Sequence, residues 1–421
     1  MIAQWLRDNA HTLHTDPHDF SDLEPLRDIV GDARVVAIGE STHRVHELYQ
    51  IRHRLTRFLV TELGFTAFVM ESGFPEGLRV NDWVRGGPGD LDELLNHGIT
   101  YHMGKCAEMR DQLTWMRAHE VRFYGMDIPD SSASARPAVE ACLAFLADAD
   151  PDYAAAVATS LLPLFDYLPA DRTGLAWAAP ALHAYLALEP AVRNEMTARI
   201  GDLAERMQAQ RVVYQNPSRI AAAFRCAATA RHTDAFLQAM AAAKDRTYAG
   251  ANIRDAAMAE NVEWILGRED RIVIAAANGH VQRWPFRIPM LTNDMTTLGE
   301  HLATSLGDRM IVIATAVGGG TFYLHRPIPD GPPGHTEVFT EDMVTPDPHS
   351  LDALLATAGI PHYLVDLRKL PAGHLAETTS IMTGMQPTPV NPKAAFDAVV
   401  YVDKVTPWHT FVDVSPSPHP G

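Results

Sequence analysis

Short hydrophobic runs alternate with longer amphipathic stretches in the first part of the chain, and this pattern predicts a strand–helix–strand unit. Residues 34–38 form an apolar run without polar alternation, as central parallel strands do. After it, apolar residues recur at helical spacing from Leu48 to Leu63, and Gly64 stands where a helix commonly ends. A second strand follows at 66–71, so a right-handed crossover is the expected connection.

The rest of the chain predicts further strands on either side of a long helical stretch. Strands are expected at 121–126, 271–277, 309–316, 321–325, 361–366 and 396–402, and helices at 2–13, 20–30 and 349–358. Residues 137–265 are rich in alanine, punctuated by prolines and free of strand signals, which predicts several helices.

These elements predict an α/β fold: a mainly parallel central sheet flanked by helices, with a large all-helical insertion. The α/β core would comprise residues 1–136 and 266–405. The insertion, residues 137–265, would form one wall of a cleft. Residues 406–421 contain several prolines and would form a flexible tail.

Length and charge narrow the functional classes. A chain of 421 residues is longer than one hydrophobic core usually supports, which is about 250–300 residues. The net charge of -17 argues against binding to nucleic acid or to anionic membranes, because both require a basic surface. No window approaches the roughly eighteen uninterrupted apolar residues of a membrane span, and no signal peptide is recognisable. We therefore expect a cytoplasmic protein that acts on a small molecule and binds neither nucleic acid nor membrane; its oligomeric state is left open.

Four of the predicted strands end on polar residues suited to acid–base chemistry. Glu40 and Glu71 end the first two strands, Asp127 follows the third, and Asn278 and His280 follow the fourth. One polar strand end is ordinary, because strands often stop where they reach the surface. The carboxyl ends of parallel strands, however, meet at one edge of a sheet, where ligands bind. We therefore expect an active-site crevice at this edge.

His43 is the candidate general base. Ser41 or Thr42 could cap the helix that follows, which would place His43 in or just before its first turn, where an imidazole stays neutral. A neutral imidazole can accept a proton, and Glu40 or Glu71 could fix its tautomer. The alternative is a histidine that only caps the helix or packs against it.

Two geometric relations depend on the fold. Arg52 lies nine residues after His43, and nine steps of an ideal helix turn through about 900°, onto the opposite side. Either His43 precedes the regular helix or Arg52 serves another surface. Glu40 and Glu71 would lie near each other if their strands are neighbours, about 4.8 Å apart. One of the two could then hold a raised pKa while the other stays ionised.

Several well-known motifs are absent from the sequence. It contains no GxGxxG or P-loop for nucleotides, no GxSxG for serine hydrolases and no HExxH for zinc. His43 and His46 with Glu40 and Glu71 could ligate a metal, although their spacing matches no recognised ligand set. We expect neither a cofactor nor a catalytic metal.

A set of short motifs runs through most of the chain in a fixed order. They are Gly39-Glu-Ser-Thr-His43, Arg52-His-Arg54, Phe68-Val-Met-Glu-Ser72, Phe123-Tyr-Gly-Met-Asp127, Arg254-Asp255, Ala277-Asn-Gly-His-Val281 and Asp366-Leu-Arg368. In this order and spacing they resemble the erythromycin esterase family, which includes proteins labelled succinoglycan biosynthesis proteins. The resemblance implies an α/β sheet with added helices, a deep cleft and metal-independent ester hydrolysis in which His43 activates water. It also implies active-site roles at Glu40, Arg52, Glu71 and His280.

The chain departs from the family pattern at one position. Family esterases usually carry two histidines after this strand, in Ala-His-Asn-x-His, and here Ala277 replaces the first of them. Three functions therefore compete. The first is hydrolysis of an ester or lactone in a bulky natural product. The second is a biosynthetic proton transfer without net hydrolysis, such as cyclisation, elimination or acyl rearrangement. The third is a binding protein or metal-dependent relative that holds an ion or haem.

The first hypothesis assigns a role to each candidate residue. His43 would deprotonate water, and Glu40 and Glu71 would orient it or manage protons. Arg52 and His280 would bind the carbonyl oxygen or the leaving alcohol. The candidate substrate-binding residues are Asp127, Arg254, Asn278 and His46.

Overall fold

An eight-stranded sheet forms the centre of the protein, in a computed structural model that describes residues 2–14, 16, 19–169, 178–214, 217–242, 246–287, 293–328, 330–331, 336–371 and 373–411. Its strands are β1 (His11–Thr12), β2 (Val35–Glu40), β3 (Ala67–Gly73), β4 (Arg122–Asp127), β5 (Ile272–Ala277), β6 (Met310–Val317), β9 (His362–Asp366) and β12 (Ala398–Val402). They are arranged in the order β1-β9-β12-β6-β2-β5-β3-β4. The strands from β12 to β4 run parallel, and β9 is antiparallel to its two neighbours.

Helices cover both faces of this sheet. The helices of the described residues, including those that lie beyond the sheet, are α1 (Ile2–Asn9), α2 (Leu26–Val30), α3 (His46–Leu63), α4 (Phe74–Val84), α5 (Leu91–His97), α6 (Ala107–Ala118), α7 (Pro129–Ser132), α8 (Arg136–Ala149), α9 (Pro151–Leu161), α10 (Ala178–Ala187), α11 (Pro190–Ala209), α12 (Pro217–Ala242), α13 (Arg246–Leu266), α14 (Asn278–Val281), α15 (Leu298–Leu306), α16 (Leu351–Ala356) and α17 (Pro392–Ala395). Short 3-10 turns lie at Ser21–Leu23, Leu162–Phe165, Gly307–Arg309 and Leu367–Lys369.

The central strands are buried along their whole length, which explains their continuous apolar runs. In β2, Val36 and Ile38 face a core shared with α3 and α6, whereas Val35 and Ala37 face a core shared with α13 and α15. Both faces are covered, so apolar residues fill most of each strand, and in β2 the first charged residue, Glu40, stands at the last position. The predicted α/β architecture, with a mainly parallel sheet and flanking helices, is what the chain adopts.

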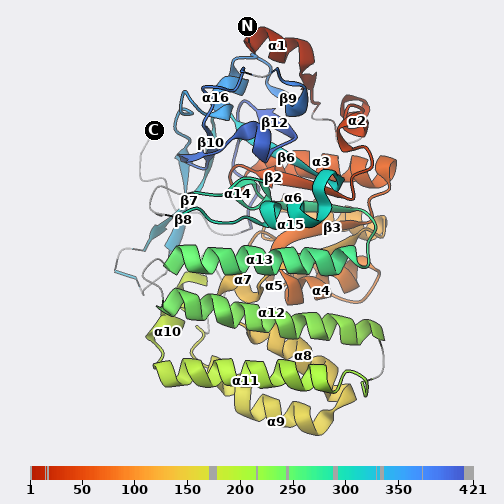
Figure 1. Ribbon diagram of the computed structural model, residues 1–421, viewed down its shortest axis with the longest axis vertical. Coiled ribbons are helices and arrows are strands. Elements are labelled where there is room, and N and C mark those ends of the chain that lie inside the picture. Colours follow the sequence, from red (N-terminus) through yellow and green to blue (C-terminus); the bar gives the residue numbers. More distant parts are fainter. Residues whose placement is uncertain are drawn as a thin grey trace.

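Helices α8 to α12 stack beyond one edge of the sheet and form the predicted helical insertion (Figure 1). They enclose a separate apolar core that includes Phe145, Leu161 and Met207. α13 runs along α12 and also packs against the sheet, so it belongs to both layers (Figure 1). No helix among the described residues combines the length and apolar character that crossing a lipid bilayer requires.

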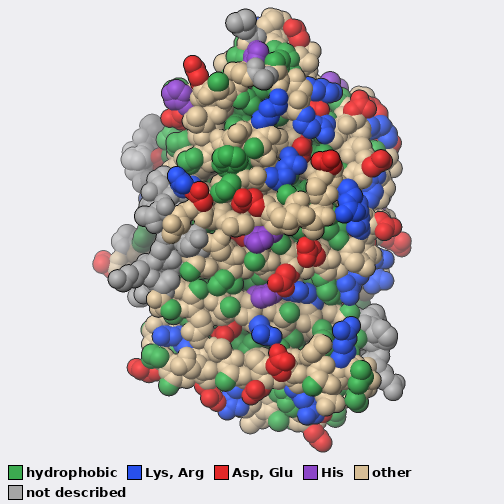
Figure 2. Space-filling view, viewed as in Figure 1, with side chains coloured by type: hydrophobic (Ala, Val, Ile, Leu, Met, Phe, Trp, Pro, Cys, Tyr) green, Lys and Arg blue, Asp and Glu red, His purple; other side chains and the backbone are tan. Residues whose placement is uncertain are grey.

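Two hairpins lie outside the main sheet. β7 (Thr321–Pro327) pairs with β8 (Thr336–Asp342), and β10 (Ser380–Thr383) pairs with β11 (Gln386–Pro389). The strand predicted at 321–325 is therefore present, but it belongs to a hairpin. Acidic and basic side chains are interspersed on the face drawn in Figure 2, so the negative net charge is not gathered there in one patch.

The N-terminal helices are shorter than predicted. α1 ends at Asn9, because His11 and Thr12 pair with β9 instead of continuing the helix. The predicted helix at 20–30 is divided into a 3-10 turn and α2, with Pro25 at the start of α2. Proline lacks the N–H that an uninterrupted helix would need at this position.

The segment 405–411, hereafter the C-terminal segment, is folded against the core, although we expected a flexible tail from residue 406. Trp408 is only 1% exposed and stacks edge-on against Tyr49. Its backbone N–H donates to the carbonyl of Arg44 over 3.0 Å, and Ala107 donates to the carbonyl of His409 over 3.0 Å. The segment thus crosses the N-terminal ends of α3 and α6. Residues 412–421 lie outside the described part of the chain.

Candidate active site

The four polar strand ends meet at one edge of the sheet, because β2, β5, β3 and β4 are consecutive parallel neighbours. The expectation that Glu40 and Glu71 end adjacent strands was wrong, because β5 lies between β2 and β3. The end of β5 joins the two acids instead. Ala277 is the register partner of Glu40, and its backbone N–H donates to Glu71 Oε2 over 2.9 Å.

Asn278 holds three strand ends together. Its Nδ2 donates to the Thr315 carbonyl over 2.8 Å, and its Oδ1 accepts from the Thr315 N–H over 3.2 Å, so the side chain reaches across β2 to β6. Gly39 lies in the crossing, where an added Cβ would stand 2.2 Å from Asn278 Oδ1. Only glycine leaves room for this bridge. Asn278, predicted to bind substrate, is 1% exposed and uses both amide atoms within the fold.

His43 and Glu40 form a hydrogen-bonded pair in which Glu40 Oε1 contacts His43 Nδ1. Glu40 Oε2 accepts from Arg52 Nη1 over 3.4 Å. Arg52 is itself buried between the Tyr49 ring, 3.8 Å from its guanidinium carbon, and Gln112, whose Oε1 lies 3.5 Å from Nη2. The chain Arg52–Glu40–His43 fixes the imidazole through Nδ1 and leaves Nε2 as the nitrogen that can accept a proton. The His43 side chain is 34% exposed, so solvent reaches it.

The start of α3 resolves the geometric question about Arg52. The N-cap of α3 is Val45, in an extended conformation and without a side-chain cap, and the helix begins at His46. Our expectation that Ser41 or Thr42 caps this helix was wrong. His43 therefore precedes the regular helix, and the chain turns at Arg44, which has a left-handed φ of 65°. This turn brings His43 and Arg52 to the same carboxylate, which an ideal helix would not do.

Arg254 on α13 forms hydrogen bonds with the acidic residues of two neighbouring strands, Glu71 of β3 and Asp127 of β4. Its Nε lies 3.0 Å from both carboxylate oxygens of Asp127, and its Nη2 donates to Asp127 Oδ2 over 2.5 Å and to Glu71 Oε1 over 2.8 Å. Burial opposes the charge of Arg254, but Asp127, Tyr101 and Glu71 raise its pKa well above its ordinary value. The guanidinium is thus permanently charged in a buried setting, where charge-assisted hydrogen bonds are strong.

His280 is the second imidazole of the site, and it is held as a cation. Its Nδ1 donates to Asp255 Oδ1 over 2.9 Å, and its Nε2 lies 3.3 Å from Glu71 Oε1. Burial lowers the pKa of His280, as does Arg254, whose Nη1 lies 3.3 Å from His280 Nε2, but Asp255 and Glu71 outweigh both and raise the pKa to about 10. Burial likewise opposes ionisation of Glu71, yet His280, Arg254 and His43 hold the pKa of its carboxyl well below the usual value.

The two histidines therefore differ in kind. His43 is paired with one carboxylate and open to solvent, whereas His280 is an imidazolium between two carboxylates. Glu71 belongs to both environments, since it contacts His280 and its pKa responds to the charge of His43. A base and an acid set apart by their surroundings are the elements of general acid–base catalysis.

Two residues of this cluster were not among the predicted site residues. Asp255 orients His280 and accepts the Leu298 N–H over 2.8 Å, and its place beside Arg254 in the sequence was the signal available. Tyr101 donates its hydroxyl to Asp127 Oδ2 over 2.9 Å, and its ring lies 5.2 Å from the Arg254 guanidinium. It comes from a loop without a recognisable pattern, so no sequence signal marked it.

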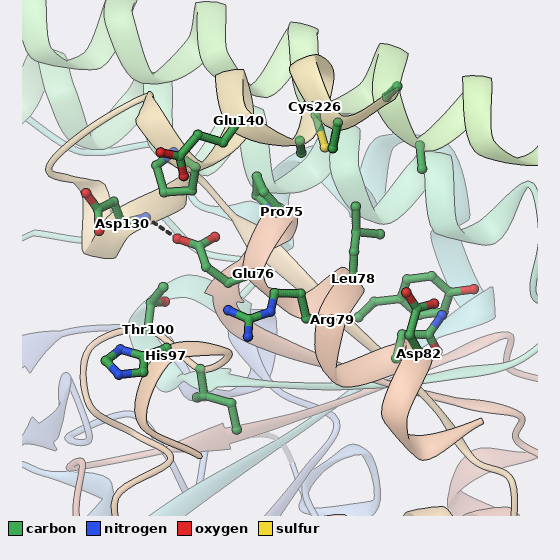
Figure 3. A pocket seen from close by; sticks show the side chains of 18 of the residues that line it. Pro75, Glu76, Leu78, Arg79, Asp82, His97, Thr100, Asp130, Glu140 and Cys226 are labelled. Atoms are coloured by element: carbon green, nitrogen blue, oxygen red, sulfur yellow. Dashed lines mark hydrogen bonds between the residues drawn. The ribbon is translucent and has the colours of Figure 1, made fainter. Parts of the chain in front are cut away.

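A cavity of about 1190 Å³ lies beside this cluster, between α4 and α5 on one side and α8 and α12 on the other. Figure 3 shows Glu76 accepting the Asp130 N–H near one end, and Glu140 and Cys226 on the opposite wall. Tyr101 lines the cavity and also contacts Asp127, so the cavity adjoins the charged cluster at this residue.

His46 does not join His43. It lies with Glu108 of α6 and His409 of the C-terminal segment. Across the described residues, this is the one group of three or more His, Cys, Asp or Glu whose ligand atoms all lie within 4.8 Å of one another. The metal set considered from sequence, which combined His46 with His43 and both acids, is therefore not brought together.

The pairing of His280 predicts a pH-dependent contribution to stability. Its pKa is about 10 in the folded protein and near 6.5 in an unfolded chain, so its stabilising contribution is complete below about pH 6.5. As the pH rises toward 10, that contribution should fall by about 1.4 kcal/mol per pH unit, because the folded state retains a proton that the unfolded state releases. Urea unfolding across this range should show a shallower decline for His280→Gln than for the wild type. Identical slopes would show that His280 is not held as a cation.

Comparison with known proteins places this geometry in a family. The sequence profile described as erythromycin esterase matches residues 60–405. The chain belongs to the erythromycin esterase family. It is 25% identical over 419 residues to erythromycin esterase type II of Escherichia coli, covering 96% of this chain and 97% of that protein. Erythromycin esterase type I of Escherichia coli is 23% identical, covering 76% of this chain and 79% of that protein.

Solved structures share the fold. A protein from Bacillus cereus superposes with a TM-score of 0.80 at 23% identity, covering 98% of both chains. A mutant of the erythromycin esterase EreC in its open conformation superposes with a TM-score of 0.77 at 19% identity, covering 96% of this chain and 99% of that one. The predicted family and the predicted fold class are thereby confirmed. Membership of the family supports a hydrolase role for this chain.

Proposed function

We propose that this protein hydrolyses an ester or lactone of a bulky small molecule, with His43 as the general base and without a metal in the chemistry. The observation that carries the proposal is the Arg52–Glu40–His43 chain, which leaves one imidazole nitrogen of a solvent-accessible histidine free to take a proton. The two erythromycin esterases of Escherichia coli support an ester as the substrate class.

The reaction begins at His43. Its Nε2 removes a proton from a water molecule, which attacks the ester carbonyl carbon. Glu40 accepts from Nδ1 and so stabilises the imidazolium that forms, in the manner of the carboxylate of a catalytic triad. Arg52 is buried behind Glu40 and touches no open space, so it is a positioning residue that holds the carboxylate by its second oxygen.

His280 and Arg254, the two cations of the site, would stabilise the negative charge that develops on the carbonyl oxygen. The attack turns the carbonyl oxygen into an oxyanion, which is best stabilised by donors already in place. His280 and Arg254 are charged before substrate arrives, and their carboxylate partners keep them oriented. His280 can also protonate the departing alkoxide, because its pKa of about 10 keeps it protonated at neutral pH.

The surroundings favour a large substrate. The cavity beyond Tyr101 is about 1190 Å³, at or above the usual upper range for a small-molecule site. A substrate with its carbonyl at His43 and His280 would extend its remote part toward Tyr101 and the helical insertion. Asp127 and Arg254, predicted to bind substrate, pair with each other, and Tyr101 donates to the same carboxylate.

The replacement of a family histidine by Ala277 favours one alternative. Ala277 is the register partner of Glu40 and donates to Glu71, so a side chain at this position would stand between the two acids. Without a second imidazole there, the cleft has a smaller set of bases. The same residues could then carry out a proton transfer without net hydrolysis, such as a cyclisation, elimination or acyl rearrangement in a biosynthetic pathway.

The test is a product analysis by mass spectrometry. Purified protein incubated with macrolactones and simpler esters should yield products that have gained one water, and a sample stripped of metal should retain this turnover. A product of unchanged mass, or one that has lost water, would favour the proton-transfer alternative. The absence of turnover across a broad ester panel would contradict hydrolysis.

A further inference from the structure

A second cluster of ionisable side chains lies outside the reaction centre. It consists of His46 at the first position of α3, Glu108 at the start of α6 and His409 in the C-terminal segment. Glu108 Oε1 lies 2.5 Å from His46 Nδ1 and 2.8 Å from His409 Nδ1. The two imidazole rings meet edge to face with their centroids 4.6 Å apart. The proposed hydrolysis uses none of these three side chains.

The donor set is that of a late first-row transition metal. Two imidazole nitrogens and one carboxylate oxygen suit Zn²⁺ and its neighbours, whereas Ca²⁺ and Mg²⁺ prefer oxygen alone. Ligand atoms in a tetrahedral zinc site, with bonds of about 2.0 Å, stand about 3.3 Å apart. Glu108 Oε1, which is 2.5 Å from one imidazole nitrogen and 2.8 Å from the other, would have to move away from each by less than about 1 Å to reach that spacing.

The cluster has one side anchored in protein and one side open to solvent. The Glu108 side chain is 6% exposed and the His46 side chain 21%, whereas the His409 side chain is 68% exposed. The exposed imidazole can adjust to the ion, and water can fill the remaining coordination position. This arrangement also supplies the entry path that a metal site needs.

The backbone around the cluster holds the three ligands in place. His46 donates its N–H to the Thr406 carbonyl over 2.9 Å, and His409 donates its N–H to Glu108 Oε1 over 3.1 Å. Glu47 accepts from the Thr406 N–H over 2.7 Å. Ligands positioned by a rigid framework lose little freedom on binding, which favours a specific site.

We propose that His46, Glu108 and His409 bind a divalent transition metal of the zinc class, and that this ion clamps the C-terminal segment to the N-terminal ends of α3 and α6. The ion takes no part in the chemistry at His43. It acts on the same stretch of chain, because Trp408 donates to the Arg44 carbonyl in the turn that carries His43.

The test is metal binding by the untagged, full-length protein after chelator treatment. Titration with Zn²⁺ should show one site per chain, and Co²⁺ should give the visible absorption of a low-coordinate nitrogen and oxygen site. His409→Ala, His46→Gln and Glu108→Gln should each weaken binding by about 10–100-fold or more. His409→Ala is the most informative of the three, because its side chain is exposed and its loss leaves the core intact.

Two controls separate this site from other histidines. His349→Ala removes an exposed histidine far along the chain and should leave Zn²⁺ affinity unchanged. His43→Ala should bind the ion like the wild type, so the metal site and the proposed hydrolysis can fail independently. Zn²⁺ should also slow amide hydrogen exchange in residues 405–411 of the wild type but not of His409→Ala.

The result that would overturn the proposal is equal Zn²⁺ binding by the wild type and His409→Ala. Such binding would be adventitious, at other histidines of the chain. A wild type that binds no Zn²⁺ or Co²⁺ would equally overturn it, and the cluster would then be a hydrogen-bonded fastening of the C-terminal segment.

Discussion

His43→Ala should slow ester hydrolysis by about 10²–10⁴-fold while leaving the protein folded. The variant removes the free nitrogen that takes a proton from water, and a positioned general base contributes about 10²–10⁴-fold in rate. The side chain is one-third exposed and precedes α3, so its loss creates no buried cavity. The measurement is kcat on the best substrate of the ester panel, with circular dichroism to verify the fold.

His349→Ala is the matched control for this variant. It also removes one surface imidazole, but from a loop at the start of α16, and kcat should stay at the wild-type value. A His43→Ala protein that retains wild-type turnover would rule out His43 as the base. Glu40 or Glu71 would then have to be examined in its place.

Arg254→Met should destabilise the protein by about 3–5 kcal/mol, which is the usual cost of removing one partner from a buried ion pair. Asp127 is fully buried, and Arg254 is the cation that contacts both of its oxygens. Glu71 loses the same partner. The free energy of unfolding in urea, measured near neutral pH, gives the loss directly.

Two further variants test this explanation. Arg199→Met removes a half-exposed arginine that pairs with Glu195 on α11, and it should cost under about 1 kcal/mol. Adding Asp127→Asn to Arg254→Met should recover part of the lost stability, because the buried charge is then absent. An Arg254→Met protein as stable as Arg199→Met would show that the acids do not depend on Arg254.

The residues at the strand ends were predictable because burial on both faces leaves little choice along a parallel strand. In β2, every residue from Val35 to Glu40 is buried, so the first acidic residue marks the point where the strand leaves the core. The same reasoning located Glu71, Asp127 and His280. This reasoning uses only the sequence of each strand, so it does not require the order of the strands in the sheet to be known.

Relations between distant segments were not predictable in the same way. Strand order places β5 between Glu40 and Glu71, and no local pattern records that order. Asp255 contacts His280 from α13, the helix that precedes β5, and no local pattern in the sequence indicates this contact. The prolines near the C-terminus predicted a flexible tail, yet Trp408 is buried and packs against Tyr49 of α3.

The start of α3 was misjudged for a physical reason. Serine and threonine are favoured caps, so Ser41 and Thr42 were the expected ones. The chain instead makes a tight turn through Arg44 and starts the helix after Val45, without a capping side chain. The start of α3 therefore lacks a side-chain cap, but the turn places His43 within hydrogen-bonding distance of Glu40.

The position of α13 has a consequence for how the chain could be divided into parts. Arg254 and Asp255 are contributed by the last helix of the region between β4 and β5, whereas Glu40 ends β2 and His43 lies in the turn between β2 and α3. A shortened protein lacking residues 137–265 would thus lose Arg254, which we propose stabilises the oxyanion, and Asp255, which contacts His280, and not merely an outer layer. Grafting the helical region of a relative onto this sheet should succeed only when the donor brings its own arginine–aspartate pair in register with His280.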